Sequence, residues 1–123
     1  MEEMERMLKK IEAILAKESA YKFEAYSFVM AGLHDTVSKL SDPRHVSGKE
    51  LSEGLRDYAL EQFGPLARTV LEYWGIRSTL DFGKIVFLLI DTQLLRKTEE
   101  DSIHDFENVY DFPQAFQYEI KEE

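Results

Sequence analysis

The sequence predicts a mainly α-helical protein that folds as a single compact domain over residues 1–123. Hydrophobic residues make up 44% and charged residues 32% of the chain, a balance typical of soluble globular domains. Apolar residues recur every three or four positions through most of the first 95 residues, which indicates amphipathic helices. Proline and glycine interrupt this pattern at a few places. We therefore expect about five helices, followed from residue 96 by a short acidic and aromatic C-terminal extension.

The first two helices follow from apolar spacing alone. Residues 1–20 contain an amphipathic helix. Its apolar stripe consists of Met4, Met7, Leu8, Ile11, Ile14 and Leu15. Packing of this stripe on the protein's own core is favoured, and a homodimer seam through residues 2–18 is the alternative. A second helix is expected from about Lys22 to Leu40, because the residue before Pro43 avoids helical geometry and proline cannot continue the helix.

Capping residues set the next three helices. Ser47 and Glu50 have the spacing of a capping box and predict the start of a third helix, which ends at Gly64-Pro65. A short fourth helix from Pro65 to about Trp74 ends at Gly75. Ser78 and Asp81 repeat the capping pattern for a fifth helix. The side chains expected to point inward from the third and fourth helices are Leu51, Leu55, Tyr58, Ala59, Phe63, Leu66, Val70 and Leu71.

The segment from Phe82 to Ile90 is apolar on nearly all sides and is expected at the centre of the core. For Ile85–Ile90 a helix is favoured, and a buried strand is the alternative. The third to fifth helices followed by residues 94–98 also allow a winged-helix-like arrangement. In that arrangement the fifth helix would be buried, because Lys84 is its only basic residue after the cap.

The C-terminal extension, residues 96–123, combines charge with aromatic rings. It holds nine acidic and three basic residues, and five of the 15 aromatic residues of the chain. So many rings favour an ordered segment laid over the helices. A small β element within this segment is an alternative. We expect fraying only over the last three or four residues.

Charge and composition exclude several classes of function. The formal net charge of -9 and the pI of about 4.8 make direct nucleic-acid binding unlikely. The charged N-terminal segment does not resemble a signal peptide, and no stretch is apolar enough to span a membrane, so a cytoplasmic location is expected. The chain has no cysteine, and its glycines form no phosphate-binding loop. We predict no catalytic group, cofactor or metal, and hence no enzyme.

Three groups of polar residues have both a functional and a structural interpretation. The acidic run around Glu99–Asp101 could hold a divalent cation, but it lacks the pattern of a calcium-binding loop, and a solvated acidic loop is favoured. Neighbouring pairs such as His34-Asp35 and His104-Asp105 point in different directions on a helix and are not dyads. Arg44-His45 could meet an anion, but pairing with Asp42 or with a helix C-terminus is favoured.

Three parts of the chain are distinctive: Arg44–Leu51, then Phe63–Thr79 with Asp81–Gly83, and Leu94-Leu95 with Lys97–Ser102. They resemble a family of small uncharacterised bacterial proteins from Verrucomicrobia and Planctomycetes. The similarity extends over about residues 20–116. The resemblance implies a bacterial, cytoplasmic protein and transfers no catalytic residue.

The sequence is therefore interpreted as a non-enzymatic protein-protein interaction or adaptor module. A winged-helix-like, nucleic-acid-associated regulator is the alternative. The acidic and aromatic surface suits a basic or amphipathic protein partner. Arg68, Arg77, Arg96 and Lys97 are expected to form surface ion pairs with the acidic extension. The candidate contact residues are Arg68, Trp74, Arg77, Glu99, Glu100, Asp101, Asp105 and Tyr110.

Overall fold

A computed structural model describes residues 2–117, which form a single compact domain built from helices. The mainly helical fold class is thereby confirmed. In chain order the elements are α1 (Glu2–Lys17), α2 (Phe23–Ser38), α3 (Gly48–Phe63), the 3-10 turn η1 (Gly64–Leu66), α4 (Ala67–Tyr73), α5 (Thr79–Asp91), the 3-10 turn η2 (Ile103–Phe106) and α6 (Phe112–Ala115).

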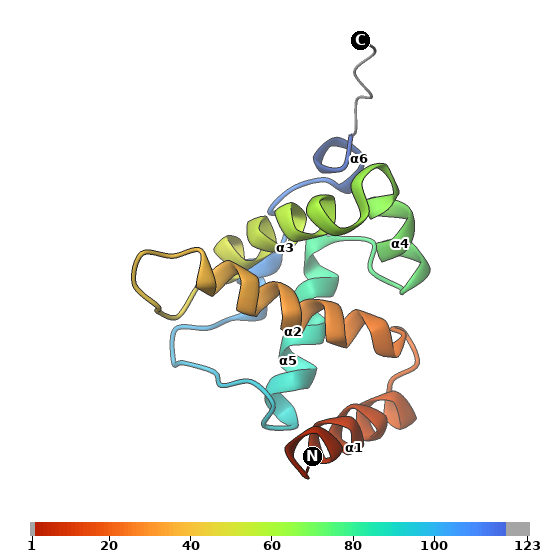
Figure 1. The fold of residues 1–123 in the computed structure, drawn as a ribbon, viewed down its shortest axis with the longest axis vertical. Helices are drawn as coiled ribbons and strands as arrows, with labels where there is room; N and C mark the ends of the chain where they lie inside the picture. The colour runs from red at the N-terminus through yellow and green to blue at the C-terminus, as the bar shows by residue number, and fades with distance from the viewer. Residues whose placement is uncertain (1, 118–123) are drawn as a thin grey trace.

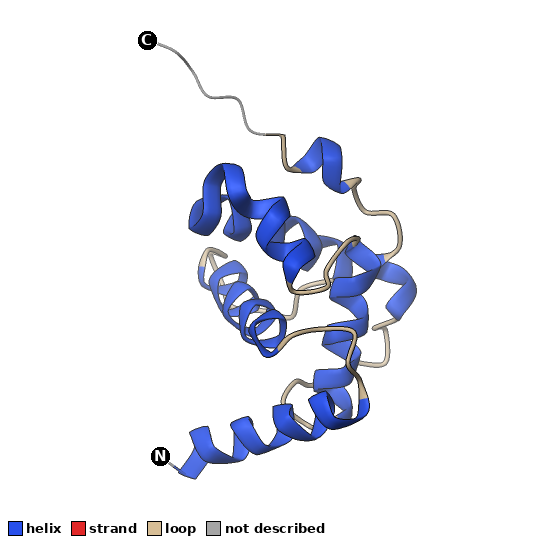
Figure 2. Cartoon of the chain, turned by 90° about the vertical axis from the view of Figure 1, so that its right-hand side faces the viewer, coloured by secondary structure: helices blue, strands red, loops and turns tan. Residues whose placement is uncertain are grey.

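Helix α2 occupies the middle of the assembly. It packs against α3 on one side and crosses α5, which lies behind it in Figure 1. Helix α1 packs against α2 at one end of the molecule, and η1 leads from α3 directly into α4. Figure 2 shows only helices and loops, and residues 2–117 contain no strand. The optional β element and the strands of a wing are therefore not found in this part of the chain.

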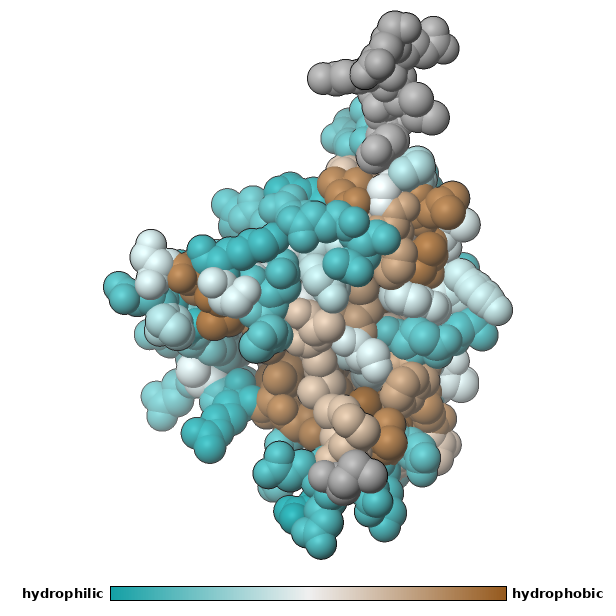
Figure 3. All heavy atoms as spheres, in the orientation of Figure 1, coloured by the Kyte–Doolittle hydropathy of each residue, from teal (hydrophilic) through white to brown (hydrophobic). Residues whose placement is uncertain are grey.

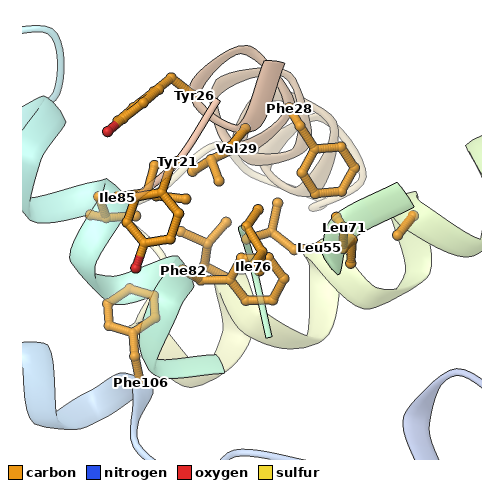
Figure 4. Close-up of a cluster of buried hydrophobic side chains, with 14 of the residues drawn as sticks. Tyr21, Tyr26, Phe28, Val29, Leu55, Leu71, Ile76, Phe82, Ile85 and Phe106 are labelled. Atoms are coloured by element: carbon orange, nitrogen blue, oxygen red, sulfur yellow. The ribbon is translucent and has the colours of Figure 1, made fainter. Parts of the chain in front are cut away.

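The core forms where α2, α3, α4 and α5 meet. Figure 4 shows Val29, Leu55, Phe82 and Ile85 converging between these helices. Leu89 is 0% exposed, as is Ile85. Because α5 runs from Thr79 to Asp91, the segment 85–90 is a helix and not a strand. Its predicted place in the core is confirmed for Ile85, Val86 and Leu89, whereas Phe87, Leu88 and Ile90 are only half-buried.

The predicted caps explain where α3 and α5 begin. The hydroxyl of Ser47 accepts a hydrogen bond from the Glu50 amide at 3.1 Å, and the Glu50 carboxylate accepts one from the Ser47 amide at 3.0 Å. The Asp81 carboxylate accepts in the same way from the Ser78 amide at 3.2 Å. Gly64 ends α3 with φ of 52°, a left-handed value that favours glycine.

The predicted burial of the α3–α4 junction was wrong in part. Leu66 was expected in the core but is 60% exposed. The reason is η1, whose tighter winding turns Leu66 away from the core before α4 begins. Tyr58 and Phe63 are half-buried rather than enclosed, whereas Leu71 is fully buried as expected.

Only part of the apolar stripe of α1 is buried against the other helices. Ile11 and Ile14 are buried in the core, which confirms packing on the protein's own helices. Met4, nearer the N-terminus, is 60% exposed. A homodimer through residues 2–18 stays a prediction.

The C-terminal extension lies over the helices as predicted. The rings of Phe106, Phe112 and Phe116 are buried. Phe106 packs so closely on α3 and α5 that a Cβ added at Gly48 would lie 2.9 Å from its ring, and one at Gly83 would lie 2.8 Å from it. Tyr118 and the predicted frayed end lie outside the described residues.

Candidate functional site

A hollow of the described surface lies between α2, α5 and two loops, and we call it the groove. Its volume is about 240 Å³. Leu33 and Val37 of α2 face Phe87 and Ile90 of α5 across it, and Leu95 adds a fifth half-buried apolar side chain. The buried side chains Val46, Leu51, Val86 and Phe106 complete its apolar lining. Apolar side chains thus remain uncovered around one concave space, an arrangement that suits binding.

A polar contact between two side chains joins the two loops that border the groove. Nε2 of His45 lies 2.8 Å from Oδ1 of Asp101. The other carboxylate oxygen of Asp101 accepts a hydrogen bond from the Thr98 amide at 2.7 Å. Burial raises the pKa of Asp101, but the Thr98 amide and the His45 ring outweigh it and hold that pKa below its ordinary value. The contact between His45 and Asp101 connects loops that are distant in sequence. Together, His45 and the Thr98 amide give each carboxylate oxygen of Asp101 a partner.

The sequence-based partner of Arg44 was wrong. Its guanidinium binds the carboxylate of Glu50 with two hydrogen bonds, of 2.6 and 3.1 Å, and not Asp42 or a helix C-terminus. The Arg44 guanidinium and the Ser47 amide lower the pKa of Glu50 to about 2. Glu50 therefore completes the cap of α3 and fixes Arg44 at the border of the groove.

None of the four basic residues expected to pair with the acidic extension, Arg68, Arg77, Arg96 and Lys97, forms such an ion pair within residues 2–117. Arg68 pairs instead with Glu72, one turn along α4, at 2.9 Å. The Lys97 ammonium lies 5.4 Å from the centre of the Phe87 ring. Arg96 lines the groove and, like Arg77, forms no ion pair with a described residue.

A second surface combines side chains from α3, η1 and the end of α4, and we call it the aromatic face. It consists of Tyr58, Phe63, Leu66, Tyr73 and Trp74. Trp74, Phe63 and Tyr58 line an open depression of about 290 Å³. Leu66 and Tyr73 are 60% and 64% exposed. In Figure 3, hydrophobic residues gather near the junction of α3 and α4, apart from a longer band along and below α2.

Two rings of the aromatic face pack against each other and against a buried ring of α2. Trp74 packs edge-on against Phe63, with ring centres 5.6 Å apart. Both rings lie near the buried Phe28, at 5.8 and 6.1 Å between centres. Edge-on and tilted packing of this kind fixes aromatic side chains in place.

The predicted contact residues do not form one patch. Trp74 lies on the aromatic face at the C-terminal end of α4, and Arg68 lies near the start of the same helix. Asp101 and Asp105 line the groove, whereas Arg77 and Tyr110 line a separate hollow. Glu99 and Glu100 are exposed on the loop beside the groove.

Tyr110 has a structural position. Its hydroxyl donates a hydrogen bond of 2.6 Å to the backbone oxygen of Ser52, and its ring stacks on Phe112. Burial raises the pKa of the Tyr110 hydroxyl well above its ordinary value. This side chain fastens the extension to α3.

Sequence reasoning missed most of the groove and of the aromatic face. Phe87 and Ile90 were assigned to an enclosed helix, and only their half-burial reveals a lining role. The sequence did carry a signal for this role. Helix α5 is apolar on several sides, and one neighbouring helix covers only one of them. For the aromatic face, the signal was the aromatic residues that flank Gly64-Pro65.

The acidic segment shows no metal-binding geometry within the described chain. Among residues 2–117, no group of three or more His, Asp or Glu side chains is placed to hold a metal ion. The Asp105 carboxylate accepts a hydrogen bond from the Ser102 amide at 3.3 Å and so caps η2.

Comparison with known proteins adds no relative. No family model, curated protein or solved structure matches the chain. Within the described residues, none of the helices has the length and apolar character needed to cross a membrane. The resemblance to the bacterial family therefore stays a prediction.

Proposed function

We propose that this protein is a non-enzymatic interaction module that binds a segment of another protein on its aromatic face. The observation that carries the proposal is the open depression lined by the rings of Tyr58, Phe63 and Trp74. Leu66 and Tyr73, which are 60% and 64% exposed, lie on the same short segment of chain as Trp74, in η1 and α4. Tryptophan and tyrosine dominate the binding energy of many protein interfaces. A grouped apolar surface of this kind marks an interaction site more often than scattered single residues do.

The rigidity of the face supports the proposal. The rings of Phe63 and Trp74 rest on Phe28, which is itself buried, so binding costs little side-chain entropy. The depression between them is shallow and open, which suits a protein partner better than an enclosed small molecule.

The charge of the chain indicates which partner fits. The formal net charge is -9, and Glu24 lines the depression without an ion pair to any of residues 2–117. Opposite charge speeds association and favours the correct partner. The proposed partner segment is therefore an amphipathic helix with apolar residues on one side and basic residues at its borders. The resemblance supports a bacterial, cytoplasmic setting.

Trp74 makes the proposal directly measurable, since it is the only tryptophan of the chain. The probe is a synthetic amphipathic helix of leucine and lysine, compared with the same peptide carrying glutamate for lysine. We expect the lysine peptide to shift the Trp74 emission to shorter wavelength in a saturable manner, and the glutamate peptide to bind at least about tenfold more weakly.

Matched variants separate the aromatic face from general charge attraction. The double variant Leu66→Ser, Tyr73→Ser is expected to weaken binding of the lysine peptide by about tenfold or more. Met4→Ser removes an equally exposed apolar residue from α1 and is expected to leave binding unchanged. Equal effects of both changes, or an emission that does not respond to either peptide, would contradict the proposal. A duplex DNA that binds at low salt and dissociates as salt rises would favour the nucleic-acid alternative instead.

A further inference from the structure

The groove carries an inference independent of the aromatic face, because its shape and its charges differ. Five half-buried apolar side chains surround it, contributed by α2, α5 and the loop that follows α5. These are Leu33, Val37, Phe87, Ile90 and Leu95. Concave spaces lined mainly by apolar groups, with a few polar groups at the border, are typical of small-molecule sites.

Most polar groups at the border of the groove already have partners. His45 binds Asp101 at 2.8 Å, and Arg44 binds Glu50 at 2.6 Å. Asp105 accepts from the backbone amide of Ser102. Both acidic side chains that line the groove therefore already have hydrogen-bond partners within the protein.

Arg96 is the exception. Its side chain lines the groove, is exposed, and forms no ion pair within residues 2–117. The planar guanidinium offers several N–H donors that match a carboxylate. An unpaired cation beside an uncovered apolar space favours a ligand with an anionic head and an apolar body.

We propose that the groove binds a small amphipathic carboxylate, with its apolar body between Val37 and Phe87 and its carboxylate at Arg96. The volume of about 240 Å³ sets the size of this ligand. An apolar protein cavity of about 150 Å³ binds benzene, which has six carbon atoms, so the groove accommodates a somewhat larger apolar body. An aliphatic or aromatic acid of about eight carbon atoms therefore fills it.

The test is an NMR titration of the full chain, labelled with nitrogen-15, with octanoate as the probe. Octanoate is expected to cause saturable shifts of the amide signals of residues that line the groove. Octanol and octylammonium have the same apolar body without the negative charge, and each is expected to bind about tenfold more weakly. Acetate, which lacks the apolar body, is expected to cause no saturable shift, and dodecanoate is expected to gain little over octanoate because the groove is already full.

Two arginine variants provide the matched comparison. Arg96→Gln is expected to weaken octanoate binding by about tenfold, whereas Arg77→Gln removes the same charge at another hollow and is expected to have no effect. Both side chains are exposed, so neither change should disturb folding, and thermal melts check this. Equal losses in both variants, shifts outside the groove, or equal binding of octylammonium would overturn the proposal. The emission of Trp74 is read in the same samples, so failure at the groove is distinguishable from failure at the aromatic face.

Discussion

Asp101 lies 2.8 Å from His45, although 56 positions separate the two residues in the sequence. The same carboxylate holds the Thr98 amide, so it orders the loop after α5 and connects it to the loop before α3. Asp101→Ala removes both interactions. We expect the Thr98 amide to exchange with solvent faster in this variant, while the free energy of global unfolding falls by only about 1 kcal/mol because the loop is exposed.

Hydrogen exchange measured by NMR checks this expectation. His45→Ala serves as the control, since it removes the contact with the Asp101 side chain but leaves the Thr98 amide bound to Asp101. Unchanged exchange of the Thr98 amide in Asp101→Ala would show that the carboxylate does not order the loop.

Glu50 predicts how stability depends on pH. Its pKa is lowered from 4.5 to about 2 in the folded protein, chiefly by Arg44 and the Ser47 amide. A carboxyl whose pKa is lower in the folded state stabilises that state above its unfolded pKa, and this contribution is lost as the pH falls toward the folded pKa. We expect Glu50→Gln to lower the free energy of unfolding near neutral pH, and the difference from the unmodified chain to disappear as the pH approaches about 2.

Urea denaturation at several pH values measures this difference. Glu53→Gln is the control, because Glu53 is an acid on the same helix that forms no ion pair with a described residue. Parallel pH dependence in both variants would contradict the assignment.

The cap at Ser47 has a defined energetic contribution. Ser47→Ala leaves the Glu50 amide without its side-chain acceptor, and we expect a loss of about 1 kcal/mol of unfolding free energy. Ser41→Ala, in the exposed loop before α3, is expected to cost much less. Chemical denaturation compares the two, and equal losses would argue against the cap.

Leu89 tests the position of the core. Leu89→Asp places an unpaired charge at a residue that is 0% exposed, and we expect the chain not to fold. Leu89→Ala should fold with a loss of about 2–5 kcal/mol. Leu66→Asp, on the exposed 3-10 turn, should fold normally, and circular dichroism melts distinguish the three variants. A Leu89→Asp chain with an unchanged melt would disprove the core assignment.

Thr79 connects α5 with the C-terminal extension. Its hydroxyl donates to the Phe106 oxygen at 2.6 Å and accepts from the Val109 amide at 3.2 Å. Thr79→Val keeps the shape but leaves both backbone groups unpaired, so we expect a loss of about 1–3 kcal/mol. Thr69→Val, on the exposed side of α4, is the control, and denaturation curves that coincide for the two variants would contradict this role.

Local signals in the sequence predicted the helices well. The boxes at Ser47 and Ser78 act over three residues, so spacing alone places the starts of α3 and α5. The apolar stripe of α1 predicted Ile11 in the core for the same reason, because helical periodicity is a local property. The prediction that Leu66 is buried was wrong, because a 3-10 turn replaces the expected first turn of the fourth helix.

The candidate sites depend on contacts that the sequence does not display. The pairing of His45 with Asp101 requires two loops to meet, and the adjacent His-Asp pairs in the sequence gave no indication of it. Tyr110 was predicted at a contact surface from its acidic surroundings, but its hydroxyl reaches the backbone of α3. Trp74 was predicted correctly at a helix end, whereas its aromatic neighbours on the surface follow only from the way α3 meets α4.

The close packing of Phe106 on Gly48 and Gly83 makes these three positions interdependent during evolution. Neither glycine has room for a methyl group while the ring is in place. A related sequence that carries alanine at position 48 or 83 should therefore carry a smaller residue at position 106. Paired changes of this kind in distant relatives would indicate that their extension packs on α3 and α5 in the same way.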